Sequence, residues 1–199
     1  DRDFCFCHLS YHGAKNAAYT ADRYWELAAK KGRDDNPYRY SFLQLIGVAE
    51  TDEEAERIYA PHAEYFFRKL LYTASHYQAI PGCLEYPALV QALTNNPRGG
   101  FNLREMRAKD FYNNGFVIVG SPKTVRDQLV EHMKRLRVGH LLTLLHFGSM
   151  STELCKRNID LFAREVLPDL EGLWSEYDDR WWPQRLKAKG RQQAMAAAE

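Results

Sequence analysis

Short apolar runs alternate with longer stretches of helical periodicity in the first part of the chain. Residues 4–9 (FCFCHL) have the length and composition of a buried strand. The Ala-rich stretch 14–31 predicts a helix that ends at Gly32, since glycine readily adopts the left-handed conformation of a helix cap. A second strand is expected over 38–49 and a helix over 52–72. The order strand, helix, strand, helix is typical of parallel βα units.

Residues 73–115 interrupt this alternation with several Pro and Gly residues. A stretch of this length between regular elements is usually an insertion, an active-site lid or a binding loop. Regularity resumes with a strand-like run over 116–120, a helix that ends near Gly139 and a strongly apolar strand over 141–147. One face of this helix is expected to carry the apolar residues Val125, Leu129, Met133 and Leu136. A final long helix follows Ser151, and its expected inner face consists of Leu154, Asn158, Ile159, Leu161 and Phe162.

Two of the expected helices begin with capping signals. Thr51 and Glu54 have the spacing of a capping box, in which each side chain bonds to the backbone of the other residue. Ser121 and Pro122 predict an N-cap followed by a first-turn proline. The same VGSP turn resembles a phosphate-binding turn, because a helix N-terminus presents unpaired N–H groups. A plain capped helix start is the favoured interpretation.

Composition bounds the class of protein. The 199 residues suggest one domain, expected over 1–183 with an aromatic strap at 174–183 and a flexible tail over 184–199. Lys and Arg total 27 against 26 Asp and Glu, and this balance argues against a nucleic-acid-binding surface. No apolar run approaches the roughly 20 residues of a membrane span, so no membrane partner is expected. Aromatic residues make up 13% of the chain, enough for a large core or a pocket for a flat ligand.

The cysteines predict neither disulfides nor a metal site. Cys5 and Cys7 alternate within one apolar run and lack the CxxC spacing of redox and zinc sites. With Cys83 and Cys155, they are expected to be buried, unpaired thiols in a reducing cytoplasm.

Polar residues collect where the expected strands end. The first strand ends in His8, Ser10 and Tyr11, the strand over 141–147 carries His146 at its end, and Gln44 is a polar residue among apolar neighbours. In parallel βα folds the carboxyl ends of the strands meet at one edge, where ligands bind. These positions therefore predict a pocket at that edge.

The second half of the chain resembles a known family. From Gly115 onward, GFVIVGSPKTVRDQLVEHMKRLRVGHLLTLLHFGSMSTELCKRNIDLFAREVLPDL is similar to the C-terminal segment of bacterial luciferase-like flavin-dependent monooxygenases. Upstream, VAETDEEA at 48–55 resembles the family's exit from its penultimate strand, and the resemblance covers roughly 4–172 in consistent order. It implies an α/β fold of the (β/α)8 TIM-barrel type that binds reduced FMN at the carboxyl face and oxidises a small organic substrate with O2. Some branches of the family use F420.

The resemblance also implies that only the C-terminal portion of a barrel is present, about strands 6–8 with their helices. Residues 73–115 would be the lid, and the family's catalytic His would precede Asp1. Ser10 and Tyr11, with His8 and Gln44, match cofactor-binding positions, and His146 is a candidate catalytic residue. The segment by itself is expected to expose open sheet edges and to be unstable or to aggregate.

The resemblance leaves other activities open. Implied partners are a flavin reductase that supplies reduced flavin and a second copy in a homodimer. The alternatives are an F420- or FMN-dependent oxidoreductase that transfers hydride without activating O2, and a non-catalytic barrel companion subunit.

Overall fold

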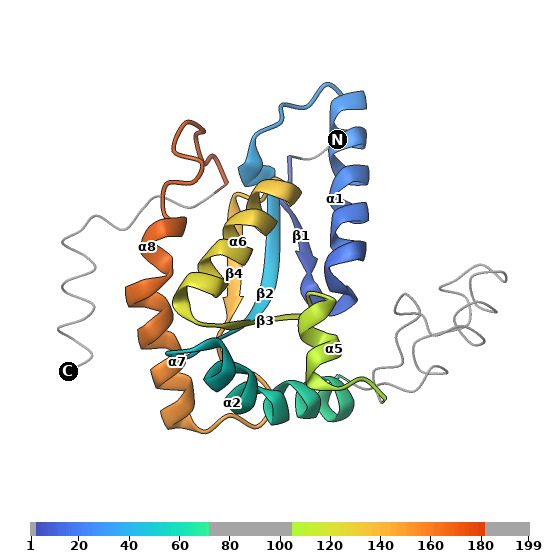
Figure 1. Cartoon of the computed structure of the whole chain (residues 1–199). Coiled ribbons are helices and arrows are strands. Elements are labelled where there is room, and N and C mark those ends of the chain that lie inside the picture. The colour runs from blue at the N-terminus through green and yellow to red at the C-terminus, as the bar shows by residue number, and fades with distance from the viewer. Residues whose placement is uncertain (1–2, 72–104, 182–199) are drawn as a thin grey trace, which may run out of the picture.

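Strands and helices alternate along the chain, as the sequence predicts (Figure 1). The computed structural model describes residues 3–71 and 105–181. The described strands are β1 (Phe6–Leu9), β2 (Tyr40–Val48), β3 (Val117–Gly120) and β4 (His140–Leu144). The described α-helices are α1 (Gly13–Lys30), α2 (Asp52–Tyr65), α5 (Ala108–Asn113), α6 (Pro122–Leu136), α7 (Thr152–Glu165) and α8 (Leu167–Leu170).

β2 is the central strand of a parallel sheet, because each of the other described strands pairs with it. β1 and β4 pair with the same residues of β2 and therefore lie on its opposite edges. Leu45 of β2 pairs with both Val117 of β3 and Leu144 of β4, so β3 and β4 lie on opposite sides of β2. β3 therefore lies on the same side of β2 as β1, further along the strand. Among the described residues, β1 and β4 each have one unpaired edge.

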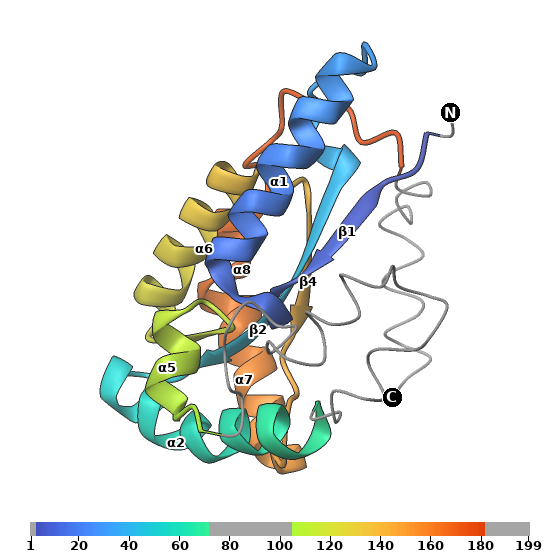
Figure 2. The same ribbon diagram turned by 90° about the vertical axis from the view of Figure 1, so that its right-hand side faces the viewer.

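One face of the sheet is covered by helices. Phe42 and Ile46 of β2 point to this face. Because side chains alternate along a strand, the other even-numbered residues of β2 point to it as well. They pack against α1, α6 and α7, and Figure 2 shows α1 and α6 on the same side of the sheet. On α6 the contact is an apolar stripe at the spacing that the sequence predicts: Val125, Leu129, Met133 and Leu136.

The odd-numbered residues of β2 point to the opposite face, which we call the open face. Residues in register on neighbouring parallel strands point to the same side, so they form rows across the sheet. The two rows nearest the amino-terminal end are Cys7–Ser41–His140 and Leu9–Leu43–Leu142. We call the second of these the leucine row. Its outer members, Leu9 and Leu142, are 39% and 42% exposed, while Leu43 between them packs against the core at the carboxyl end of the sheet. Within residues 3–71 and 105–181, the row is therefore a partly exposed apolar surface.

A second core lies at the carboxyl end of the sheet. α2 and α5 pack there, with Tyr59 of α2 donating a hydrogen bond of 2.9 Å from its hydroxyl to the carbonyl oxygen of Val48. Past Tyr65, α2 continues in a π-helical turn, Phe66–Leu70, which brings a further aromatic ring into this core. The buried aromatic residues of this core are Tyr59, Phe67, Phe111, Phe116 and Phe147.

Asn158 of α7 connects β2 to the chain just beyond β4. Its side chain is fully buried. Its amide nitrogen donates to the carbonyl oxygens of Ile46 and Leu145 at 2.9 and 2.8 Å, and its amide oxygen accepts from the N–H of Val48 at 2.8 Å. The side chain therefore supplies backbone hydrogen bonds where the ladder between β2 and β4 ends.

The predicted N-caps Thr51 and Ser121 are confirmed, but only the Thr51 half of the expected capping box is found in the described residues. The hydroxyls of Thr51 and Ser121 accept hydrogen bonds from backbone N–H groups in the first turns of α2 and α6. Glu54, the second member of the expected capping box, pairs its carboxylate with Arg157 of α7 at 3.1 Å. Gly32 follows α1 with a φ of +66°, as expected of a left-handed cap.

Some expectations about burial and strand length are wrong. β1 is an outer strand rather than a buried one, and Phe6 is 38% exposed. β4 ends at Leu144 instead of continuing to residue 147, because the chain leaves the edge of β2 there. Ile159 does not belong to the inner face of α7: it is 42% exposed, while Leu161 and Phe162 are buried.

The expectation of buried thiols is also wrong. Cys7 is exposed, because β1 lies at the edge of the sheet, and Cys5 and Cys155 are half-buried. All three are free thiols, as the sequence predicts. Cys83 lies outside the described residues.

The described part of the aromatic strap packs against the amino-terminal end of the sheet. The indole N–H of Trp174 donates to the carbonyl oxygen of Val138 at 2.6 Å, and that of Trp181 donates to Asp3 at 3.0 Å. Arg137 ends α6 in a left-handed conformation, with a φ of +53°. Its guanidinium lies over the rings of Trp174 and Tyr177. The strap thus joins both ends of the described chain.

Candidate functional site

Ser10 and Gln44 meet at the carboxyl side of β1, as the sequence predicts for two polar residues near strand ends. The Ser10 hydroxyl and the Gln44 amide nitrogen each donate to the carbonyl oxygen of Phe116, both at 3.2 Å. Both side chains are fully buried. The Gln44 amide oxygen is also buried and has no hydrogen-bond partner among the described residues. Gln44 belongs to the even-numbered residues of β2 and therefore faces the helix layer, not the open face.

Tyr11 lies in an aromatic cluster just beyond β1. Its ring centre is 5.7 Å from that of Phe66 and 6.5 Å from that of Phe67, both in the π-helical turn. Burial raises the pKa of the Tyr11 phenol, so this hydroxyl stays protonated at neutral pH. Tyr11 therefore offers a hydrogen-bond donor at the rim of the carboxyl-end core.

His8 and His146 lie apart from Ser10 and Gln44. The His8 ring stacks on Phe42 at 5.8 Å, and Phe42 faces the helix layer. His146 follows the end of β4, is exposed, and has its Nε2 atom 3.3 Å from the carbonyl oxygen of Met150. The structure thus brings two of the five predicted site residues together, and a catalytic role of His146 stays a prediction.

The N-terminus of α6 is occupied by a carboxylate of the chain itself. Asp52, the first residue of α2, accepts hydrogen bonds from the N–H of Ser121 at 2.6 Å and from the hydroxyl of Thr124 at 3.0 Å. A Cβ atom on Gly120 would lie 2.8 Å from the same carboxylate. The VGSP turn is therefore a capped helix start and not a phosphate site. Sequence reasoning missed Asp52, although an acidic residue at a first helical turn is a known partner for N–H groups.

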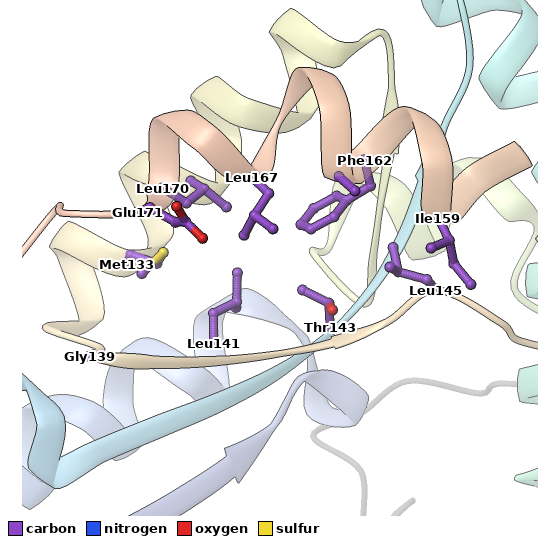
Figure 3. Close-up of a pocket in the computed structure, with 11 residues that line it drawn as sticks. Met133, Gly139, Leu141, Thr143, Leu145, Ile159, Phe162, Leu167, Leu170 and Glu171 are labelled. Carbon is purple, nitrogen blue, oxygen red and sulfur yellow. The ribbon is translucent and has the colours of Figure 1, made fainter. Parts of the chain in front are cut away.

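An apolar groove of about 390 Å³ lies beside the outer edge of β4 (Figure 3). Leu141 and Thr143 of β4 extend toward Phe162 and Leu167 on the helices, and Glu171 supplies a carboxylate at one end. The lining is otherwise aliphatic or aromatic, so the groove suits an apolar occupant. It lies on the helix-covered side of β4, away from the leucine row.

The residues of the site match one part of a flavin. A flavin needs an apolar wall for its ring system and N–H groups or cations for its phosphate. The leucine row is such a wall. The Ser10 hydroxyl donates to the carbonyl oxygen of Phe116, and the Gln44 amide nitrogen donates to those of Phe116 and Leu45. Asp52 occupies the one helix start that the sequence suggested for a phosphate. In the described part of the chain, the leucine row thus offers an apolar surface, and the turn before α6 offers no phosphate site.

The described residues contain neither a metal-binding cluster nor a helix that could cross a membrane. Within residues 3–71 and 105–181, no group of three or more His, Cys, Asp or Glu side chains could hold a metal ion. No helix in the described part of the chain combines the length and apolar character that a membrane crossing requires.

The chain matches one family model and resembles several solved structures. The model, described as luciferase-like monooxygenase, matches residues 2–140. No curated protein sequence matches the chain.

One similar structure is the oxygenating constituent of 3,6-diketocamphane monooxygenase from the CAM plasmid of Pseudomonas putida, a type II Baeyer–Villiger monooxygenase in complex with FMN. Its TM-score is 0.55 at 18% identity, over 82% of this chain and 42% of that chain. Monooxygenase RslO1 from Streptomyces bottropensis gives a TM-score of 0.50 at 16% identity, over 83% of this chain and 42% of that chain. The chain spans less than half the length of either structure, and the likeness is one of fold.

Proposed function

The chain belongs to the luciferase-like monooxygenase family, and on that premise we propose that it supplies the C-terminal βα units of a (β/α)8 barrel enzyme. The enzyme oxidises a small organic substrate with reduced FMN and O2. The observation that supports this proposal best is the open face. Its leucine row is apolar, and the outer members Leu9 and Leu142 are exposed in the described part of the chain, as on the inner face of an unclosed barrel.

The edges of the sheet support the same proposal. β1 and β4 each pair with β2 alone among the described strands, whereas every strand of a closed barrel has two neighbours. The groove beside β4 is the place where a further βα unit would pack its apolar side. We propose that β1, β2 and β4 are strands 6, 7 and 8, and that β3 is a short strand added beside strand 7.

In this enzyme the leucine row forms part of the wall of the flavin cavity. Reduced flavin supplies the electrons that activate O2, and a dry apolar wall protects such chemistry from water. Ser10 and Gln44 fix the Phe116 carbonyl, and with it the start of β3, at the edge where the cavity opens. The phosphate contacts come from other parts of the protein.

The structural part of the proposal is tested by reading the coding sequence upstream of Asp1. A complete barrel needs about five further βα units there. An upstream sequence without them contradicts the assignment of β1, β2 and β4 to strands 6–8.

The chemical part is tested on the protein expressed from the complete reading frame. Quenching of FMN fluorescence measures cofactor binding. Incubation with reduced FMN, ¹⁸O₂ and a panel of small aldehydes, ketones and sulfonates measures oxygen transfer. We expect one labelled oxygen atom in the product. Substrate oxidation without labelled oxygen would favour a hydride-transferring oxidoreductase that uses FMN or F420. Absence of flavin binding would favour a companion subunit.

A further inference from the structure

Four segments of the chain bring a thiol, an imidazole, a carboxylate and a hydroxyl together at the amino-terminal end of the open face. Cys5 precedes β1, Ser41 lies on β2, His140 begins β4, and Asp179 belongs to the strap. This cluster lies at the end of the sheet opposite the carboxyl edge and is independent of the proposed flavin chemistry.

The contacts link the four groups in a chain. Cys5 Sγ lies 2.9 Å from Ser41 Oγ, 3.3 Å from the carbonyl oxygen of Tyr38 and 3.8 Å from His140 Nδ1. On the other side of the imidazole ring, His140 Nε2 lies 2.8 Å from Asp179 Oδ2. The side chains of His140 and Asp179 are 16% and 26% exposed, so the interaction is partly shielded from water.

This order of groups fixes the tautomer of the imidazole. A carboxylate only accepts hydrogen bonds, so Asp179 holds the proton of neutral His140 on Nε2. The Nδ1 atom then faces the Cys5 sulfur as an acceptor. A nucleophile beside a base that a carboxylate orients is the arrangement of nucleophilic catalytic sites.

The chain contains an internal reference thiol. Cys7 lies two residues further along, on the same face of β1, and is exposed. Burial of the sulfur, followed by the nearby Cys5, raises the pKa of the Cys7 thiol, which makes this thiol less reactive at neutral pH. The greater exposure of Cys7 favours its modification and its raised pKa disfavours it, so removal of His140 is needed to separate activation of Cys5 from these two effects.

We propose that Cys5 is an activated nucleophilic thiol that adds to small α,β-unsaturated carbonyl compounds. His140 takes the thiol proton on Nδ1, and the hydroxyl of Ser41 donates a hydrogen bond to the sulfur as it becomes anionic. The sulfur lone pair forms a bond to the β-carbon, the carbon–carbon π electrons move to the carbonyl as an enolate, and the enolate carbon takes the proton back from His140. No oxidant or leaving group is needed. Asp179 is a positioning residue that acts through His140.

The first experiment measures the rate of reaction of N-ethylmaleimide with the protein expressed from the complete reading frame. Two single-cysteine variants, one retaining Cys5 and one retaining Cys7, have their other cysteines replaced by Ser. General-base assistance gives about 10²–10⁴-fold in catalytic sites, and we expect Cys5 to react at least about tenfold faster than Cys7 at pH 7. Equal rates, or a faster reaction of Cys7, overturn the proposal without altering the case for a flavin enzyme.

The second experiment tests the roles of the partners in the variant that retains Cys5. His140→Ala should lower the rate to that of Cys7, and added imidazole should restore part of it. Asp179→Asn should lower the rate and Asp179→Glu should recover it. A rate unaffected by His140→Ala removes the base from the proposal. If His140→Ala fails to fold, His140→Gln, which also removes the base but keeps more of the side-chain volume, takes its place, and a rate unchanged by His140→Gln overturns the proposal.

Discussion

The carboxylate of Asp52 lies 2.6 Å from the backbone nitrogen of Ser121, so the first residue of α2 closes the N-terminus of α6. One negative charge thereby interacts with the positive ends of two helix dipoles. The hydrogen bond from Ser121 is the main cause that holds the pKa of Asp52 below its usual value.

Asp52→Asn should change how stability depends on pH. The pKa of Asp52 in the folded protein lies below its ordinary value of 3.8. The contribution of this carboxylate is therefore fully present above about pH 5 and is lost as the pH falls through the folded-state pKa. Urea unfolding between pH 3 and pH 7 should show a smaller loss of stability in acid for the variant, and a cost of about 0.5–1 kcal/mol at pH 7.

The matched control for this experiment is Asp127→Asn, which removes the same charge from an exposed pair with Lys123. It should leave the free energy of unfolding at pH 7 nearly unchanged. If both variants follow the wild-type pH profile, the contact between Asp52 and Ser121 contributes nothing to stability.

Asn158→Leu should be strongly destabilising. The change leaves the N–H of Val48 and the carbonyl oxygens of Ile46 and Leu145 without their buried partner. Unsatisfied buried groups predict a loss of about 2–4 kcal/mol in the free energy of unfolding, measured by urea titration. The same substitution at the exposed Asn113 should cost little. A loss of similar size at both positions would mean that the hydrogen bonds of Asn158 are not its cause.

Gly47→Ala should be destabilising because β2 and α2 approach each other closely there. A Cβ atom at this position would lie 2.6 Å from the ring of Tyr59, which is 1% exposed and bonded to Val48. Overpacking of this kind costs about 1–3 kcal/mol. In a Tyr59→Leu background, which removes the ring, Gly47→Ala should cost less. Additive losses in the double variant would place the cause elsewhere.

Leu142→Gln should lower turnover of the complete enzyme. Leu142 belongs to the leucine row, and a polar amide there would admit water to the proposed cavity. We expect the rate of substrate oxidation to fall by at least about tenfold while the melting temperature changes little. Leu27→Gln on α1 is the control, since Leu27 is 45% exposed and Leu142 is 42% exposed. Equal effects of the two changes would remove the leucine row from the proposed cavity.

The sequence predicts most of the local structure, because the signals for it are local. The apolar stripe from Val125 to Leu136 and the cap at Ser121 depend on neighbouring residues, and both are confirmed. The contact between Asp52 and Ser121 joins residues far apart in the chain, and no local pattern predicts it.

The candidate site was harder to predict, because it depends on strand register and strand ends. His8 and Gln44 lie on the helix-covered face, and a shift of one residue in a strand would reverse that assignment. His146 lies beyond the sheet because β4 ends earlier than its apolar run. Cys5, His140 and Asp179 carry no recognisable spacing, since their proximity arises only when the strap folds back on the sheet.

Arg137 combines an unfavourable backbone conformation with favourable side-chain contacts. A residue other than Gly at a φ of +53° costs about 1–2 kcal/mol. Its guanidinium nevertheless donates to the carboxylate of Asp35 at 2.7 Å and to the hydroxyl of Tyr177 at 2.6 Å. Directed evolution for thermostability would therefore meet opposing effects at this position: glycine would relax the turn after α6 but release the strap. We expect glycine to be selected at position 137 only in variants that no longer need the strap for stability. Its appearance in such a selection would therefore report that the strap is dispensable.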